Sequence, residues 1–360
     1  MPYDAFLLLS FGGPEHPDDV MPFLRNVTRG RGVPDERLAE VAGHYYHFGG
    51  VSPINQQCRD LLAALDVGLP KYWGNRNWQP MLADTVAQMR DDGITSALAF
   101  ATSAYGGYSS CRQYWEDIAR ARATVGPGAP AITKLRHFHD HPGFVYPHAD
   151  AVTAALSTLD PARRATTQLV FTAHSIPVSM ANTSGPQIGF STPSEGPGVG
   201  SRHSPTGGRY TAQLHETAAL VHDQSAPDLG WDLVWQSRSG PPRVPWLEPD
   251  VNDHLAVLAE KGVTDVVVSP IGFVSDHLEV VWDLDNQARE TAKNLGLGYA
   301  RAATPGTDPR FVDMIRSLVR ERTDGEPPQR LGTLPVWDVC PDNCCPAPAS
   351  ARASARLGAS

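Results

Sequence analysis

The sequence predicts an α/β protein of two similar lobes, each a doubly wound parallel sheet, with an active-site cleft between them. The first observation is a set of short, continuous apolar runs that end in Gly, Pro or Ser, which is typical of strands buried on both faces. The second is that helical patterns separate these runs. The third is a resemblance between the two halves of the 360-residue chain.

Five apolar runs are the clearest strand candidates, because each is continuous and is followed by a turn residue. They are residues 5–14, 96–105, 168–177, 232–242 and 265–274. Helical periodicity between and after them predicts helices over 78–91, 110–124, 209–223, 250–261 and 308–322. This alternation of strand and helix predicts a parallel sheet covered by helices in each lobe.

Similar strand motifs begin the two halves, and they set the expected boundaries. "AFLLLSFGGP" begins the first half and "LVFTAHSIP" the second. We expect a first lobe over 1–150, a second over 151–325 that carries the candidate site, and a partly disordered, cysteine-containing tail over 326–360. Residues 182–208 are rich in Gly, Ser, Pro and Thr, which predicts a flexible loop. This loop is either a cover for the cleft or, more simply, a tolerated surface insertion.

Composition excludes several classes of function. Apolar residues make up 41% of the chain, the net charge is −9, and acidic and basic residues are interspersed, which argues against a nucleic-acid surface. The apolar run near residue 5 is far shorter than the roughly 18 residues of a membrane span, and no signal-peptide pattern surrounds it. We therefore expect a soluble, cytoplasmic protein with no transmembrane segment.

His174 stands where the buried strand at 168–177 ends. In open α/β sheets, functional side chains gather at the carboxyl ends of strands. An imidazole at such a place can bind a divalent metal or accept a proton near neutral pH. For a single histidine, however, a core residue that bonds a backbone carbonyl is the simpler interpretation.

A second stretch, "GFVSDHLEVVWDLD" at 272–285, adds carboxylates. Asp276, Glu279 and Asp283 are three and four residues apart, so a helix places them on one face, where they can pass a hard cation or collect protons. The structural alternative makes Asp276 the N-cap and Glu279 its capping-box partner. The two interpretations are compatible, because a cap also aims a carboxylate.

Six motifs cover nearly the whole chain. They are "LLLSFGGP", "HFGGVSPIN", "SAYGGYSSCRQY", "FTAHSIP", "WQSRSGPPRVPWLEPD" and "PIGFVSDHLEVVWDLD". In this order, from about residue 3 to residue 322, the chain resembles the ferrochelatase family, whose members are lyase-class enzymes that insert Fe²⁺ into a porphyrin. The resemblance implies a chelatase-like fold with the porphyrin between two lobes.

The resemblance also implies roles for single residues. His174 corresponds to the metal-site histidine, Glu279 to a glutamate that faces it across the porphyrin, and Asp283 to an acid that guides metal. His174 and Glu279 are thus the implied catalytic residues, and all three are implied metal ligands. The implied porphyrin-binding residues are Phe11, Thr28, Arg29, Tyr45, Ser52 and Tyr114.

The chain departs from the family pattern at three positions. Phe11 stands where some relatives have a metal-ligating tyrosine, so we expect no ligand from that side. Thr28 stands where some have an arginine, although Arg29 and Arg31 are near. Gln287 replaces a further acid and shortens the acidic row.

The implied substrate is coproporphyrin III, giving Fe-coproporphyrin III (coproheme) for a downstream haem-pathway enzyme. Protoporphyrin IX enzymes of animals carry an apolar lip that associates with membrane, whereas the corresponding stretch 15–34 is charged here. The bias of basic residues toward arginine indicates a high-GC, actinobacterium-like source, for which the resemblance implies the coproporphyrin route. Protoporphyrin IX remains the alternative.

Three cysteines, Cys340, Cys344 and Cys345, crowd the tail. Some ferrochelatases hold a [2Fe–2S] cluster with three C-terminal cysteines and one from the body of the chain, and clustered thiolates suit iron–sulfur or zinc. Neither Cys58 nor Cys111 is an obvious fourth ligand from its place in the sequence. A tail without such a role is the alternative.

Two rival functions remain at this point. A cobalt or nickel chelatase would share the fold, but such enzymes tend to use a pair of histidines. A non-enzymatic haem or metal carrier would need the cleft but no base, so loss of His174 would weaken binding without removing a reaction.

Overall fold

The chain forms two four-stranded sheets in which all neighbouring strands are parallel, which confirms the predicted fold class. The computed structural model describes residues 3–186, 208–240 and 243–347. The first sheet has the order β2-β1-β3-β4, with β1 at Ala5–Ser10, β2 at Lys71–Asn75, β3 at Ser96–Ala101 and β4 at Ala131–Lys134. The second has the order β6-β5-β7-β8, with β5 at Thr167–His174, β6 at Gly230–Gln236, β7 at Asp265–Ser269 and β8 at Gly298–Arg301.

Burial on both faces explains why the apolar run of β1 is continuous. All six of its residues are fully buried. Phe6 and Leu8 point into the core that runs between the sheets, whereas Ala5, Leu7 and Leu9 point into a second core under the outer helices. Because successive side chains of a strand alternate between faces, a strand covered on both sides must be apolar throughout.

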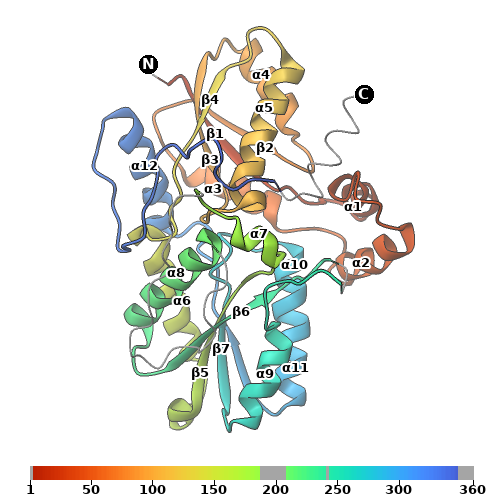
Figure 1. Ribbon diagram of the computed structural model, residues 1–360, viewed down its shortest axis with the longest axis vertical. Coiled ribbons are helices and arrows are strands. Elements are labelled where there is room, and N and C mark those ends of the chain that lie inside the picture. Colours follow the sequence, from red (N-terminus) through yellow and green to blue (C-terminus); the bar gives the residue numbers. More distant parts are fainter. Residues whose placement is uncertain (1–2, 187–207, 241–242, 348–360) are drawn as a thin grey trace.

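Helices cover both faces of each sheet (Figure 1). In the first half they are α1 (Val20–Val27), α2 (Asp35–His47), α3 (Ile54–Ala64), α4 (Leu82–Asp91) and α5 (Gln113–Val125). In the second half they are α6 (Pro142–Leu156), α7 (Val178–Asn182), α8 (Arg209–Ser225), α9 (Val251–Glu260), α10 (Leu278–Val280), α11 (Arg289–Asn294) and α12 (Pro309–Thr323). Two 3₁₀ turns, η1 (Pro17–Asp19) and η3 (Pro161–Thr166), and two π-helical segments, η2 (Tyr108–Arg112) and η4 (Val281–Ala288), complete the elements.

The two lobes share one apolar core. Phe311 of α12 packs against Phe100 of β3 and Phe138, with ring centroids about 6 Å apart. Helix α6, which spans residue 150, packs on α8 and α12 beside the second sheet. The lobes are therefore joined by packed side chains and not only by the chain that crosses between them.

Some sequence predictions fall outside the described residues. These are most of the expected loop (187–207) and the tail beyond residue 347. Among the residues that are described, no helix is long and apolar enough to cross a bilayer.

Candidate active site

His174 is the last residue of β5, at the carboxyl end of a central strand. Its Nδ1 lies within hydrogen-bonding distance of the Ser175 carbonyl oxygen, which can only accept, so Nδ1 carries the proton. In the neutral ring the other nitrogen, Nε2, then keeps its lone pair. The Tyr210 hydroxyl donates to the His174 carbonyl (2.8 Å) and fixes the backbone at the strand end. In its neutral form the imidazole therefore presents Nε2 to bind a metal or a proton.

Glu279 faces this nitrogen, with its Oε1 3.7 Å from His174 Nε2. That distance is too long for a hydrogen bond but suits two ligand atoms of one metal ion. Two ring-face contacts need roughly 7 Å, so no macrocycle fits between these side chains. The two side chains therefore meet directly in this structure, and the expected placement of Glu279 across the porphyrin from His174 stays a prediction.

The expected capping box is wrong. His277, not Asp276, is the N-cap of α10, and its ring Nδ1 accepts from Val280 N–H (3.4 Å). Asp276 lies before the helix and forms a bidentate ion pair with Arg301 (2.8 and 3.1 Å). The carboxylate that would have capped the helix is held by the neighbouring strand instead, and Glu279, in the first turn, is directed toward His174.

Asp283 lies four residues after Glu279, in the π-helical segment η4, and is only 8% exposed. The Gln236 amide (3.2 Å) and the Ser237 hydroxyl donate to its Oδ2. Ser237 has a φ of 63°, a left-handed conformation that is uncommon for a residue other than glycine. Backbone strain and π-helical segments both concentrate at functional sites, and here both serve to place one buried carboxylate.

The three groups shift one another's proton affinities. Burial lowers the pKa of His174, but the Glu279 carboxylate outweighs it and the pKa is raised overall. Burial raises the pKa of Glu279, but His174 outweighs it and the pKa is lowered overall. Burial, together with the Glu279 charge, raises the pKa of Asp283 to about 7. The site thus combines an imidazole–carboxylate pair with a carboxyl that exchanges a proton near neutral pH.

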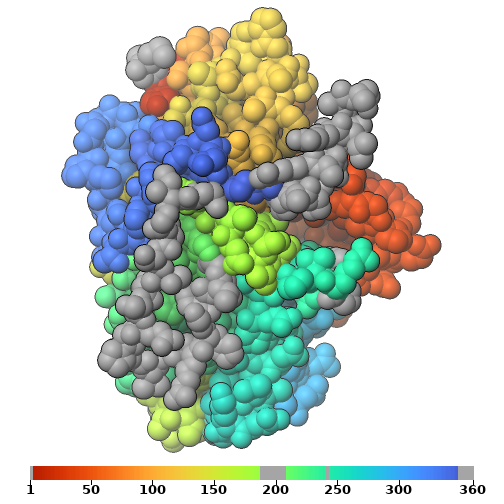
Figure 2. Space-filling model, viewed as in Figure 1, coloured from red at the N-terminus to blue at the C-terminus, as the bar shows by residue number. Residues whose placement is uncertain are grey.

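The expected porphyrin contacts divide into exposed and buried residues. Phe11, which follows β1, is 39% exposed, and its ring packs edge-on against Phe23. Tyr45 of α2 packs against the same Phe23 ring. Thr28 ends α1 with its hydroxyl bonded to the Leu24 carbonyl, and Arg29 after it is exposed. We call the surface formed by Phe11, Thr28, Arg29 and Tyr45 the first-lobe wall. It lies on α1, α2 and the segment just after β1, and Figure 2 shows α1 and α2 in red at the right of the molecular surface.

Ser52 and Tyr114 are placed differently, since each is only 4% exposed. Ser52 packs against Gly13, where a Cβ would lie 2.7 Å from the serine Cβ. The Tyr114 ring lies under the Arg76 guanidinium, 4.7 Å from the ring centroid. Both residues support the first-lobe wall from behind in this structure.

Sequence reasoning missed His44 and Trp282. His44 of α2 lies flat on Trp282 of η4, although the two belong to different lobes. His44 also lies close enough for its charge and that of Glu279 to affect each other. No local pattern signals this pair, because its partners are more than two hundred residues apart.

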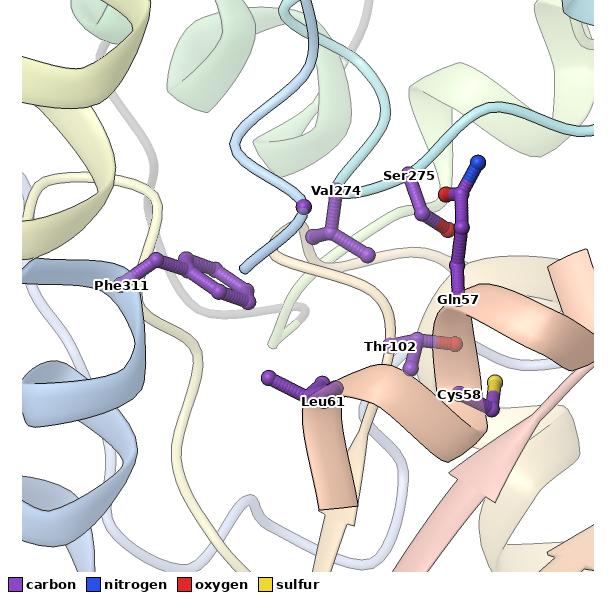
Figure 3. A pocket seen from close by; sticks show the side chains of 8 residues that line it. Gln57, Cys58, Leu61, Thr102, Val274, Ser275 and Phe311 are labelled. Atoms are coloured by element: carbon purple, nitrogen blue, oxygen red, sulfur yellow. The ribbon is translucent and has the colours of Figure 1, made fainter. Parts of the chain in front are cut away.

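A small pocket between the lobes is not the candidate site. Figure 3 shows its lining, with Gln57, Cys58 and Leu61 from α3, Thr102 after β3, and Val274, Ser275 and Phe311 from the second half. Neither His174 nor Glu279 borders it. The pocket is a packing gap at the joint of the lobes.

The structure gathers four cysteines from distant parts of the chain. All four thiols are free: the Cys344 and Cys345 sulfurs are 3.6 Å apart, and the Cys340 thiol lies within hydrogen-bonding reach of Cys344 and of Cys111 in η2. We call this group the thiol quartet: Cys111, Cys340, Cys344 and Cys345. Cys58, on α3, is buried beside the small pocket.

Polar contacts hold the tail that carries these cysteines. The Glu216 carboxylate accepts from the Thr333 N–H (2.7 Å) and bonds His139 Nε2 (3.0 Å), and Arg330 pairs with Asp140 (2.7 Å). Potential metal ligands are His, Cys, Asp and Glu side chains. Within the described ranges, one group of three of them has all its ligand atoms within 4.8 Å of one another: His139, Asp140 and Glu216. Asp140 and Glu216 thus bind the tail directly, and His139 is connected to it through Glu216.

The two-lobed parallel fold, with an imidazole at a strand end and two acids in the neighbouring helical segments, is typical of a metal-handling enzyme of the chelatase type. Residues 3–323 match the family described as Ferrochelatase. The chain is 55% identical to "Coproporphyrin III ferrochelatase" of Nocardia farcinica (96% of this chain, 97% of that protein) and 54% identical to the protein of that name from Mycolicibacterium vanbaalenii (92% and 94%). The solved structure "SirB from Bacillus subtilis with Fe3+" has the same fold, with a TM-score of 0.52 at 11% identity over 90% of this chain and 98% of that one. The chain belongs to the ferrochelatase family.

Proposed function

We propose that this enzyme inserts Fe²⁺ into coproporphyrin III. The observation that carries the proposal is the 3.7 Å approach of His174 Nε2 and Glu279 Oε1 at the carboxyl end of β5, in a chain of the ferrochelatase family. Relatives at 50–55% identity that bear the name coproporphyrin III ferrochelatase support the choice of substrate.

Metal insertion exchanges two pyrrole N–H protons for one Fe²⁺, so the site must accept protons as well as guide the ion. His174 Nε2 is the first acceptor, because its tautomer leaves that lone pair free. Glu279 stabilises the imidazolium that forms, which the raised pKa of His174 reflects. Asp283, whose pKa lies at about 7, receives each proton in turn and returns it to solvent, which frees His174 Nε2 to accept the second pyrrole proton. Neutral imidazole and carboxylate are also suitable ligands for the incoming Fe²⁺.

We place the ring on one side of the His174–Glu279 pair, against the first-lobe wall. Phe11 and Tyr45 provide apolar and aromatic surface there. Arg29, exposed beyond α1, provides a charged donor for a propionate. Coproporphyrin III has four propionates, so a charged rim suits it better than it suits protoporphyrin IX, which has two. Ser52 and Tyr114 act in this proposal by keeping the wall in place.

The deciding experiment is anaerobic metallation of coproporphyrin III and protoporphyrin IX in parallel, by wild type and His174→Ala. We expect turnover of coproporphyrin III that is lost in the variant. If the enzyme prefers protoporphyrin IX, the proposed reaction still holds but the proposed substrate is wrong. Tight ring binding without metallation of either porphyrin would favour a carrier.

We further propose that the thiol quartet holds a [2Fe–2S] cluster, with Cys111 as the fourth ligand. Three of its members are 4% exposed or less, so the sulfurs are shielded from water. The bond from the Cys111 thiol and that from Cys344 lower the pKa of Cys340 to about 3, so one thiolate forms readily. A cluster of this kind would supply redox and structural chemistry, and the four cysteines would hold it.

The cellular setting is part of the same proposal. We place the enzyme in the cytoplasm, where it would pass its iron porphyrin to the next enzyme of haem synthesis. Fractionation and a pull-down with the tagged full chain test this.

A further inference from the structure

Arg209 is the largest fully buried side chain of the described residues, at 1% exposure. Its stem lies between two glycines: a Cβ added at Gly106 would be 2.9 Å from Arg209 Cδ, and one at Gly185 would be 2.9 Å from Arg209 Cβ. The Trp337 ring covers the guanidinium at 4.3 Å. Because the two glycines and the Trp337 ring enclose the side chain so closely, the position of the Arg209 guanidinium is fixed.

That place is beside the thiol quartet. The Gly185 N–H, which borders the arginine stem, donates to Cys345 Sγ (3.1 Å), and Cys345 N–H donates back to the Gly185 carbonyl (3.2 Å). Gly106 on the other side leads directly into η2, which carries Cys111. Arg209 and all four thiols influence one another's ionisation.

The guanidinium lacks the partners that a buried arginine needs. Its Nη2 donates to the Pro335 carbonyl (3.3 Å), whereas Nε and Nη1 are buried without a hydrogen bond. Lys134, at the end of β4, is a second buried cation at 6% exposure, with one long contact to the Leu135 carbonyl (3.4 Å). In the described ranges neither cation pairs with a carboxylate, although an unpaired buried charge is costly.

Arg209 and Lys134 therefore need a nearby anion, and the thiol quartet is close to both, because each cation affects the ionisation of Cys111 and Cys340. A [2Fe–2S] centre with four thiolates carries two negative charges when oxidised and three when reduced. Two buried cations balance the oxidised form and favour addition of an electron. Neutral thiols would leave both cations uncompensated.

We propose that Arg209 and Lys134 are the built-in counter-charges of an anionic metal–thiolate centre at the thiol quartet, and that Arg209 raises its reduction potential. The inference rests on the cluster proposed above. It assigns to this pair a positioning and tuning role, not a ligand role.

The test is an anaerobic redox titration of the purified full chain, followed by visible absorbance and by the electron paramagnetic resonance signal of the reduced cluster. Arg209→Met keeps the volume and removes the charge, and Arg209→Lys keeps the charge. We expect Arg209→Met to shift the reduction equilibrium about tenfold toward the oxidised form, a potential lower by about 59 mV for one electron. Arg209→Lys should remain close to wild type.

Iron and sulfide analysis and a melting curve accompany each variant. If Arg209→Met fails to fold or to hold a cluster, Lys134→Met carries the test, with a shift in the same direction. Suppose that wild type holds a cluster and that Arg209→Met and Lys134→Met leave its reduction potential unchanged. That result overturns the counter-charge inference but not the cluster. Zinc, or no metal, in wild type overturns the cluster and this inference together, while metallation of coproporphyrin III still tests the main reaction separately.

Discussion

The imidazole of His44 lies parallel to the indole of Trp282, with ring centroids 4.0 Å apart and planes 7° apart. His44 is in the last turn of α2, which forms part of the first-lobe wall, and Trp282 is next to Asp283 in η4. His47 packs edge-on against the same indole (5.5 Å). This stack joins the two lobes beside Glu279, so we expect it to couple the position of the first-lobe wall to that of the acidic helix.

A double-mutant cycle on His44→Ala and Trp282→Ala measures that coupling. We expect a coupling free energy of about 0.5–1.5 kcal/mol in urea unfolding, the range for aromatic pairs beyond their buried area. His47→Ala with Trp282→Ala serves as the matched comparison and should couple more weakly, because the rings meet edge-on. Additive effects in the first cycle would mean that the stack does not join the lobes in solution.

Glu279→Gln should move the acid side of the pH–rate profile. Metal insertion needs neutral His174, and the Glu279 charge raises the pKa of His174, so wild-type kcat/KM falls as the pH drops through this raised value. Glutamine removes the charge and leaves the burial that lowers the pKa. Activity decreases, but the acid limb shifts to lower pH. If the acid limb stays at the same pH in the variant, a group other than His174 causes it.

Asp283→Asn should change how stability depends on pH. The folded-state pKa of Asp283 is raised from 3.8 to about 7, so between these values the folded state holds a proton that the unfolded state has lost. Wild-type stability therefore falls as the pH rises through this window, by at most about 4 kcal/mol. Asparagine does not titrate, so the variant lacks this contribution to the pH dependence of stability. Chemical unfolding below and above the window should show a smaller loss in the variant, and an equal loss would contradict the raised pKa.

The sequence was sufficient for the fold because its signals are local. Continuous apolar runs such as β1 report burial on both faces, and His174 and Glu279 each follow such a run. The relation between them was not readable, since whether a carboxylate lies 3.7 Å from an imidazole or across a ring depends on how two strand ends approach. The N-cap was misassigned for a similar reason: Arg301, from β8, takes Asp276 away from the helix.

The thiol quartet, too, could be predicted only in part from the sequence. Three of its cysteines are adjacent in the tail and could be recognised as a group. Cys111 lies more than two hundred residues earlier and meets them because tertiary contacts hold the tail, among them those of Glu216, Asp140 and Arg112. The charge of Arg209 is likewise placed by packing between glycines, which no short motif records.

Arg301 is expected to position the acidic segment. It binds Asp276 in a bidentate pair and Asp285 Oδ1 at 2.8 Å, so it connects the residues on either side of Glu279 and Asp283. Arg301→Gln should lower the free energy of unfolding by on the order of 2 kcal/mol, less than for a fully buried pair because these groups are partly exposed. It should also lower kcat more than it raises KM. Arg289→Gln, at the exposed Arg289–Asp285 pair, is the control and should change neither by much.

Cys111→Ser tests the assignment of the fourth thiol. Serine keeps the size of the side chain but is a poor ligand for iron–sulfur clusters, so we expect loss of cluster iron, sulfide and visible absorption from the purified protein. Cys58→Ser is the matched control, because Cys58 is equally buried but lies on α3 beside the small pocket and away from the thiol quartet. It should retain a full cluster. If Cys58→Ser loses the cluster and Cys111→Ser keeps it, the tail must pair with α3 in solution, and the counter-charge role of Arg209 would fail with the quartet that it depends on.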